Sequence, residues 1–530
     1  MNSTVKKIIF KLYIALVFSC VVAFPSLEVG RLSAAVGRWV IAAAAGYLGA
    51  FLFMKYGKIV SDFFTSRLAR PEAFLGRLTT GKRLFFFVWL IIVLAWIRPY
   101  LALFPGTFGY DAPIQLSQWQ GISDMTDQHP VMHTVILGII YDLGSNIFGS
   151  PSGGVALFSA LQGLLISGAL AYSFYYMRKM GVSFAFLIPA LLWVCFNPYL
   201  QALSFNCTKD IMFGAFFLLF AVFLHSLLTE ETPALSSYIY VALYAVLMCL
   251  FRHQGIYILC ILSLFTLVAP GKKSGIAKLK LLLTVVGTVL FVMVFGFFCH
   301  KILRIVPGDS REMLSVPIQQ VASVCNAKLN GINVNISNDE LLAVERIIPE
   351  SALLNYDITC ADPVKTFFDT EAFKKDMSEY VKLYLSLGLK NKGSYFTVFR
   401  VMTEGYFNAD KFWHKDLIYQ YSFKDLYDFG VSRRSLDESY LKWLKHVTSE
   451  SDGESGFIML TIYNSGVCLF VLGVLFGLCF YRKDYRLWLT LLPMLLFLAT
   501  LFLGPVALVR YVYPLLLLTP FMFFLLLPRK

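Results

Sequence analysis

The residues best suited to chemistry gather in one short loop between Pro105 and His133. The loop reads PGTFGYDAPIQLSQWQGISDMTDQHPVMH and combines carboxylates, imidazoles and aromatic rings. Carboxylates and imidazoles can accept protons or bind metals, and aromatic rings offer flat apolar surfaces to a ligand. The residues of interest are Asp111, Asp124, Asp127, His129 and His133, beside Tyr110 and Trp119. Their density predicts a catalytic or binding loop.

Asp111 is the first choice for a general base in this loop. A hydroxyl group is a weak nucleophile at neutral pH, and a carboxylate within hydrogen-bond reach can take its proton. Partial burial near a membrane surface is expected to raise the pKa of Asp111 and make it a better base. The alternative is that Asp111 only caps a helix beginning near Pro113, because Asp followed by Pro suits a helix start.

His129 and His133 are four residues apart and share one face of a helix if that helix begins at Pro130. Such spacing can bind a metal, and Asp111, Asp127 and His129 form the alternative ligand set. The glutamate of an HExxH motif is missing, so this is no metalloprotease signature. We expect no bound metal, with a divalent cation as the remaining alternative. His129 is expected to act beside Asp111 as the second catalytic residue, and His133 is a further site candidate.

Three basic residues at the edges of apolar segments could hold a phosphate group. The motifs are NCTKD with Lys209 and Asp210, FRHQG with Arg252 and His253, and GPVALVRYVYP with Arg510 and Tyr511. Phosphate is favoured at helix N-termini and by arginine side chains. The alternatives are a lysine that snorkels at the membrane edge and arginines in structural ion pairs. We predict that Lys209, Arg252 and Arg510 bind a phosphate. Asp210, His253 and Tyr511 are further site candidates beside them.

The composition places most of the chain in a lipid bilayer. Of 530 residues, 58% are hydrophobic and only 15% are charged, well below the roughly 25% of a soluble domain. A span needs about 20 apolar residues. Twelve segments qualify: 8–25, 36–55, 84–103, 153–177, 183–202, 211–228, 236–251, 256–270, 279–303, 456–480, 486–503 and 509–527. The predicted fold is an all-α membrane protein of about 12 transmembrane helices.

Basic loops predict how these helices are oriented. Lys and Arg are concentrated in residues 55–83, 178–179, 272–280, 481–486 and 529–530. The positive-inside rule puts these loops and both termini in the cytoplasm of a cell-membrane protein. Residues 131–149 are apolar enough to span, but a span there would move residues 178–179 to the outside. We therefore expect an interfacial or re-entrant helix at 131–149, where Asp142 and Asn146 would be costly in lipid.

Residues 304–455 differ from the rest of the chain. They carry a net charge of −4, whereas the remainder carries +17. The positive-inside rule explains that excess, so nucleic-acid binding is not expected. Amphipathic stretches at 371–389 and 436–448 predict a mostly helical, extracytoplasmic soluble domain of about 150 residues. The ten cysteines show no CxxC pair, so no zinc or redox motif is predicted. For Cys325 and Cys360, a disulfide and two free thiols are both compatible with the sequence.

Taken in order, these motifs resemble the GT-C class of membrane glycosyltransferases, and within it an uncharacterised bacterial multi-pass family of unknown function. The resemblance rests on PGTFGYDAPIQLSQW, QHPVMHT, TKD, RHQGIY, REMLSVPIQQVA and GPVALVRYVYP. It covers the chain from residue 84, and the first two spans are an addition. The sequence shows no P-loop and no dinucleotide fingerprint, which fits an active site away from the nucleotide sugars of the cytoplasm.

The resemblance implies a polyprenyl-phosphate sugar donor, an extracytoplasmic glycan, polymer or lipid acceptor, and inversion at the sugar carbon. By the same analogy Asp111 takes the position of the base. The class often has two adjacent acidic residues where this chain has Tyr110 and Asp111, which puts a two-carboxylate metal site in doubt. Tyr110, Gln115 and Gln319 are further site candidates from these motifs, and Gln320 adjoins them.

The predicted organisation has four parts. Residues 1–83 form two helices and a basic loop, 84–303 a transmembrane core with a catalytic loop at 104–149, 304–455 the soluble domain, and 456–530 three C-terminal helices. The expected function is transfer of a sugar from the lipid-linked donor. The alternatives are a transporter or flippase for a lipid-linked glycan, which should show internal repeats, and a glycan polymerase or ligase.

Overall fold

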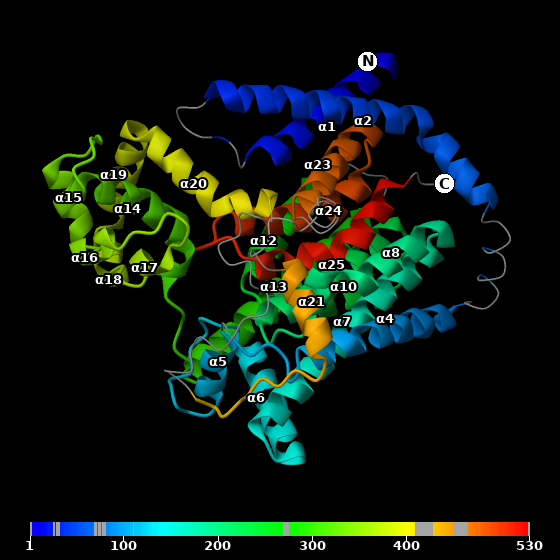
Figure 1. Cartoon of the computed structure of the whole chain (residues 1–530), viewed down its shortest axis with the longest axis horizontal. Helices are drawn as coiled ribbons and strands as arrows, with labels where there is room; N and C mark the ends of the chain where they lie inside the picture. The colour runs from blue at the N-terminus through cyan, green and yellow to red at the C-terminus, as the bar shows by residue number, and fades with distance from the viewer. Residues whose placement is uncertain are drawn as a thin grey trace.

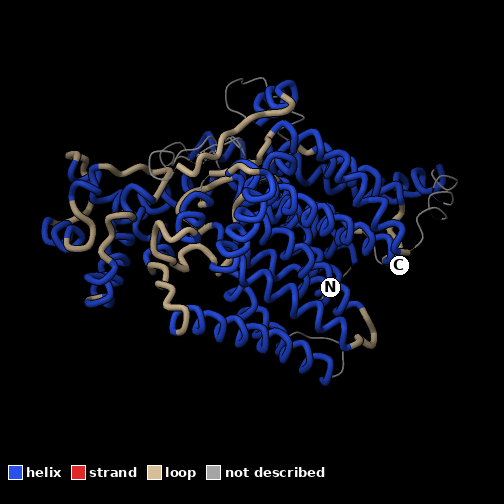
Figure 2. Tube along the Cα trace, turned by 90° about the horizontal axis from the view of Figure 1, so that it is seen from below, coloured by secondary structure: helices blue, strands red, loops and turns tan. Residues whose placement is uncertain are grey.

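The computed structural model describes residues 3–24, 27, 32–67, 72, 76, 81–109, 111–268, 275–408, 428–448 and 465–527. Within these ranges the chain forms 23 α-helices and one short 3-10 helix, without any sheet. Figures 1 and 2 both show a bundle of long helices with a smaller helical lobe at one end. The prediction of an all-α, multi-pass helical protein is confirmed.

The helices of the bundle follow the order of the predicted apolar segments. They are α1 (Ser3–Ala23), α2 (Leu32–Arg67), α4 (Lys82–Ala102), α5 (Ala112–Trp119), α6 (Val131–Phe148), α7 (Pro151–Lys179), α8 (Phe184–Phe196), α9 (Pro198–Ser204), α10 (Lys209–Thr229), α11 (Leu235–Phe251), α12 (Gln254–Val268), α13 (Gly275–Lys301), α23 (Ser465–Arg482), α24 (Tyr485–Leu501) and α25 (Val509–Leu526).

The described part of the chain contains fewer candidate membrane spans than the predicted twelve. Among the described residues, eight helices are long and apolar enough to cross a membrane, or nine if the bent pair α8–α9 forms one span. Helices α11, α12 and α24 are apolar but only 15 to 17 residues long, which is at or below the lower limit for a span. Helix α1 contains Lys6, Lys7 and Lys11, which are costly in lipid.

Helix α6 is one of the eight by length and composition, and it packs closely against α7. The ring of His133, near its start, packs against Phe158 of α7. At its other end, Phe148 lies against Gly153 of the same helix. Helix α6 therefore lies against α7 from its first turn to its last. Figure 1 shows α6 at the lower edge of the bundle, and the interfacial or re-entrant helix stays a prediction.

Helix α10 occupies the centre of the bundle. It packs against α7, α11, α24 and α25, and nearly all of its side chains are buried. Phe213 and Phe217 stack on each other and contact Phe497 of α24. By contrast, α13 exposes most of its apolar side chains, as expected of a helix that faces lipid. The first residues of α10 therefore lie in the middle of one end of the bundle.

A second, smaller core lies outside the bundle. It is built by η2 (Ser310–Leu314), α14 (Ser315–Leu329), α15 (Asn338–Glu345), α16 (Glu350–Leu354), α17 (Asp362–Lys365), α18 (Thr370–Lys375), α19 (Met377–Lys390) and the start of α20 (Lys392–Phe407). We call residues 310–395 the insert lobe. Cys325 and Cys360 are both buried and free, so no disulfide joins them.

The insert lobe is attached to the bundle through α20. This helix packs against α23 and α25, and Phe399 and Phe407 contact Phe502. Helix α21 (Glu438–Thr448) packs against α4 and α9. The described residues 428–448 therefore lie along the bundle, away from the small core of the lobe.

Glycine at position 144 allows the close approach of α6 and α7. A Cβ atom there would lie 2.7 Å from the Gly153 carbonyl oxygen and 2.9 Å from Gly154 Cα. Gly144→Ala should therefore lower the free energy of unfolding by about 1–3 kcal/mol, because backbone cannot yield easily. Gly287→Ala is the control, since nothing lies within 4 Å of the corresponding atom. Equal apparent melting temperatures of the two detergent-solubilised variants would contradict this packing.

Candidate functional site

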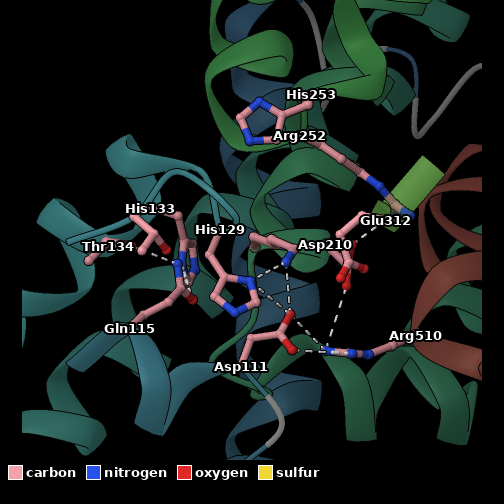
Figure 3. A network of polar contacts seen from close by, with 12 residues as sticks. Asp111, Gln115, His129, His133, Thr134, Asp210, Arg252, His253, Glu312 and Arg510 are labelled. Atoms are coloured by element: carbon pink, nitrogen blue, oxygen red, sulfur yellow. Dashed lines mark hydrogen bonds and ion pairs between the residues drawn. The ribbon is translucent and has the colours of Figure 1, made fainter. Parts of the chain in front are cut away.

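Several helix ends meet at one end of the bundle and bring the predicted site residues together. Thr107, after α4, pairs through its backbone with Asn206, before α10. The end of α11 reaches the start of α10 through the Arg252–Asp210 ion pair. The start of α25 reaches the loop after α4 through Arg510 and Asp111. Residues more than 100 positions apart in the chain thus share one site (Figure 3).

Asp111 lies directly before α5, at the position of a helix cap, but its side chain makes no capping hydrogen bond. The carboxylate instead faces basic side chains from two other helices. Lys209 Nζ lies 2.9 Å from Oδ2. Arg510 contacts the carboxylate in a bidentate manner, with Nη1 3.3 Å from Oδ2 and Nη2 3.4 Å from Oδ1. The helix does begin where the sequence predicted, and the carboxylate is free of the capping role.

The pKa of Asp111 moves in the opposite direction from the expectation. Burial raises it, but the positive charges of Arg510 and Lys209 outweigh burial and hold the pKa well below its ordinary value. The expected rise in pKa was wrong, because burial acts here together with the cations that the fold brings alongside the carboxylate. In this state Asp111 is an ionised carboxylate held in salt bridges.

His129 is bound to the same lysine. Lys209 Nζ lies 2.7 Å from His129 Nδ1, and an ammonium group can only donate. Nδ1 therefore accepts, and the ring proton of the neutral imidazole sits on Nε2. Burial, reinforced by Lys209, lowers the pKa of His129 to about 3. At neutral pH His129 is therefore uncharged and can donate one hydrogen bond through Nε2. Its low pKa makes it a poor proton acceptor.

Asp210 forms the inner half of the charged site. It is fully buried, with Arg252 Nη1 2.9 Å from Oδ1 and Arg510 Nη1 3.9 Å from Oδ2. Both guanidinium groups lie near the ring of Tyr511. We call Asp111, Lys209, Asp210, Arg252 and Arg510 the charged cluster. With three positive and two negative side chains, it carries a surplus positive charge in a largely buried place.

His133 and Gln115 form a neutral polar chain beside the cluster. His133 Nδ1 lies 3.0 Å from Gln115 Oε1, and Gln115 Nε2 donates to Thr134 Oγ1 at 2.9 Å. All three side chains are buried. Because Gln115 Oε1 accepts, Nδ1 of His133 carries its proton. This chain links α5 to α6 and thereby holds the segment that carries Asp111.

Asp127 faces a different set of partners from Asp111. Its carboxylate accepts hydrogen bonds from His300 Nε2 at 2.6 Å and from the Gly308 backbone at 2.5 Å. Its carbonyl accepts one from His253 Nε2 at 2.8 Å. Asp127 therefore ties the loop to α13 through His300, to the chain before the insert lobe through Gly308, and to the junction of α11 and α12 through His253. Sequence reasoning missed His300, although its place at the end of an apolar segment was a signal.

The charged cluster fits an anion better than a metal ion. Among the described residues, no group of three or more His, Cys, Asp or Glu side chains is arranged to hold a metal. Each Asp111 oxygen already faces a cation, and Asp127 is engaged elsewhere. Cationic side chains around a carboxylate repel a divalent ion and attract a phosphate.

Two further candidates, Gln319 and Gln320, make their contacts inside the insert lobe. Gln319 donates to the backbone carbonyls of Asp357 and Cys360. Gln320 donates to the Tyr395 carbonyl and accepts from Tyr384. Both stabilise the insert lobe internally and are not brought to the charged cluster by any of these contacts. Tyr110 lies outside the described residues.

Loss of the buried ion pair between Asp210 and Arg252 should destabilise the protein. Asp210→Asn should lower the free energy of unfolding by about 3–5 kcal/mol, because it leaves Arg252 buried without its carboxylate. Asp437→Asn is the control, since Asp437 pairs with the exposed Arg98 and should change the apparent melting temperature little. The double variant Asp210→Asn with Arg252→Met should recover part of the loss. Similar melting temperatures for both single variants would show that the buried pair is unimportant.

Comparison with known proteins places the chain in a family without assigning an activity. No curated protein and no solved structure shows significant similarity to it. The family model begins at residue 120, so it includes His129, Lys209, Arg252 and Arg510 but not Asp111. Residues 120–530 match the model of a family of unknown function, DUF6020, and the chain belongs to that family.

Proposed function

We propose that the protein is an integral membrane glycosyltransferase that transfers a sugar from a polyprenyl-phosphate-linked donor to an extracytoplasmic acceptor. The single observation that carries this proposal is the charged cluster: Asp111 within 2.9 Å of Lys209 and 3.3 Å of Arg510. It combines a carboxylate that can accept a proton with cations that can hold a phosphate. Group transfer from a phosphate-linked donor needs both.

The charge of the cluster matches that of the proposed donor. A sugar linked to a polyprenyl phosphate is a phosphodiester with one negative charge, and the cluster has one surplus positive charge. Arginine binds phosphate through two parallel hydrogen bonds. A long apolar tail on the donor would lie among the apolar helices whose ends form the site.

The proposed reaction is a single displacement at the anomeric carbon. The acceptor oxygen bonds to that carbon while the bond between the carbon and the phosphate oxygen breaks. The acceptor proton goes to the Asp111 carboxylate, and the electron pair of the broken bond leaves with the polyprenyl phosphate. Lys209, Arg510 and Arg252 stabilise the added negative charge on the phosphate, and His129 Nε2 donates a hydrogen bond to the sugar or acceptor. One displacement inverts the sugar carbon.

Contacts between the basic loops support the proposed orientation. Arg178 Nη1 pairs with Glu72 Oε1 at 2.5 Å, so two loops predicted to be cytoplasmic touch each other. Arg482 donates to the backbone carbonyls of Leu526 and Leu527, which joins a third such loop to the C-terminal end. The charged cluster lies at the opposite ends of α7, α10 and α25. An extracytoplasmic site with basic cytoplasmic loops fits the positive-inside rule.

Asp111→Asn should abolish transfer without weakening donor binding. Removal of a general base costs on the order of 10²–10⁴ in rate. The measurement uses purified protein, radiolabelled polyprenyl-phosphate sugars and an envelope-glycan acceptor, and follows labelled product and released polyprenyl phosphate. Asp142→Asn is the matched control, because Asp142 only accepts a hydrogen bond from Trp119. Transfer by Asp111→Asn at more than a tenth of the wild-type rate would remove Asp111 from the role of base.

Lys209→Met and Arg510→Met should each weaken binding of a prenyl phosphodiester by about tenfold or more. Each loses one charge-assisted hydrogen bond, worth about 1.5–3 kcal/mol. Titration calorimetry in detergent measures the affinity. Lys382→Met is the control, because Lys382 lies exposed on α19. If all three variants bind as tightly as the wild type, the cluster is not the phosphate site.

A further inference from the structure

The charged cluster contains a conflict that the proposed reaction must resolve. Asp111 must be able to accept a proton, yet it forms salt bridges with Lys209 and Arg510. The same two cations must be available to bind the phosphate of the donor. One set of side chains thus has two uses that exclude each other in this state.

We propose that the donor phosphate and the Asp111 carboxylate compete for Lys209 and Arg510, so that donor binding releases Asp111 and turns it into a base. This regulation rests on the proposed function for the identity of the anion. The exchange itself follows from the contacts in the cluster.

The two halves of the cluster differ in the way such an exchange requires. Asp210 is fully buried, and the side chain of its partner Arg252 is 8% exposed. The Asp111 and Lys209 side chains are each 16% exposed, whereas Arg510 is 8% exposed, so a ligand reaches Lys209 first and Arg510 behind it. Asp210 also lies 3.9 Å from Arg510 and can keep that guanidinium in place while its contact with Asp111 is given up. The inner pair is a fixed anchor, and the outer salt bridges are exchangeable.

Lys209 also has an alternative partner. Its ammonium group donates to His129 Nδ1 at 2.7 Å as well as to Asp111. An ammonium group has three protons, so it can turn from the carboxylate toward a phosphate and still keep its bond to the histidine.

The exchange would set the order of events at the site. Among the described residues, the charged or titratable groups that act on Asp111 are Lys209, Arg510, His129, His133, Tyr511 and, through Arg510, Asp210. When a phosphate takes the place of the carboxylate as the partner of Lys209 and Arg510 and adds its own negative charge, the pKa of Asp111 rises. The carboxylate then becomes a useful base only after the donor is bound. Without bound donor, Asp111 is too weak a base to activate water or an acceptor.

Binding of a non-reactive phosphodiester tests the competition directly. Methyl farnesyl phosphate is a suitable probe, because it carries one negative charge and does not itself titrate near neutral pH. Titration calorimetry compares the full-length wild type with Asp111→Asn and with the control Asp142→Asn. Competition predicts that Asp111→Asn binds the probe about tenfold tighter, because the carboxylate no longer opposes the phosphate. Asp142→Asn should bind as the wild type does.

A second measurement needs only the wild type. If the pKa of Asp111 rises on binding, the protein takes up a fraction of a proton per bound probe at about pH 5. Calorimetry in two buffers with different ionisation enthalpies measures this uptake, and Asp111→Asn should show none. Equal or weaker binding by Asp111→Asn without proton uptake by the wild type would overturn the competition and leave the phosphate site intact. Failure of the wild type to bind the probe would overturn both proposals.

Discussion

The salt bridge from Asp111 to Lys209 and Arg510 is the interaction on which the site depends. It joins a loop after α4, the first residue of α10 and the second residue of α25. These segments are distant in the chain and are linked by apolar helices whose packing alone would allow small shifts in register. An ion pair in a largely buried place is sensitive to such shifts, because its attraction must offset the cost of removing charges from water. The cluster therefore requires a defined alignment of the helix ends.

The arrangement of charges explains why the fold tolerates them beside apolar helices. Asp210 and Arg252 neutralise each other at the most buried point, and aromatic rings of Phe213, Phe497 and Tyr511 face the guanidinium group. Cation–π contacts of this kind lower the cost of burying an arginine. The surplus positive charge then lies toward Asp111, where the site is partly exposed. A surplus charge at that place is expensive without a ligand and favourable with an anionic one.

The insert lobe contributes to the site through the segment before Arg510. The backbone of Ala361 donates to the Pro505 carbonyl, and the Tyr406 hydroxyl donates to the Val506 carbonyl. Cys360 packs against Val506, Leu508 and Tyr511. On the other side, the bridge between Thr126 and Val306 joins the loop that bears His129 to the start of the insert. The lobe thus holds the segment before Arg510 through Cys360 and Ala361, and the chain that leads into the lobe holds the loop that bears His129 through Val306.

The sequence by itself determined the all-α membrane character, because a long apolar run has few ways to satisfy its backbone in lipid except as a helix. It also determined which polar residues stand at the ends of those runs, and so nominated Asp111, Lys209, Asp210, Arg252 and Arg510 individually. Only the tertiary structure decided that these five form one cluster, that Asp127 turns instead to His300, and that fewer than twelve helices in the described ranges have the length of a span. It also decided the direction of the Asp111 pKa shift. The physical reason is range: hydrophobic periodicity and helix starts are local properties of the chain, whereas a pKa or an ion pair depends on charges that arrive from segments hundreds of residues away.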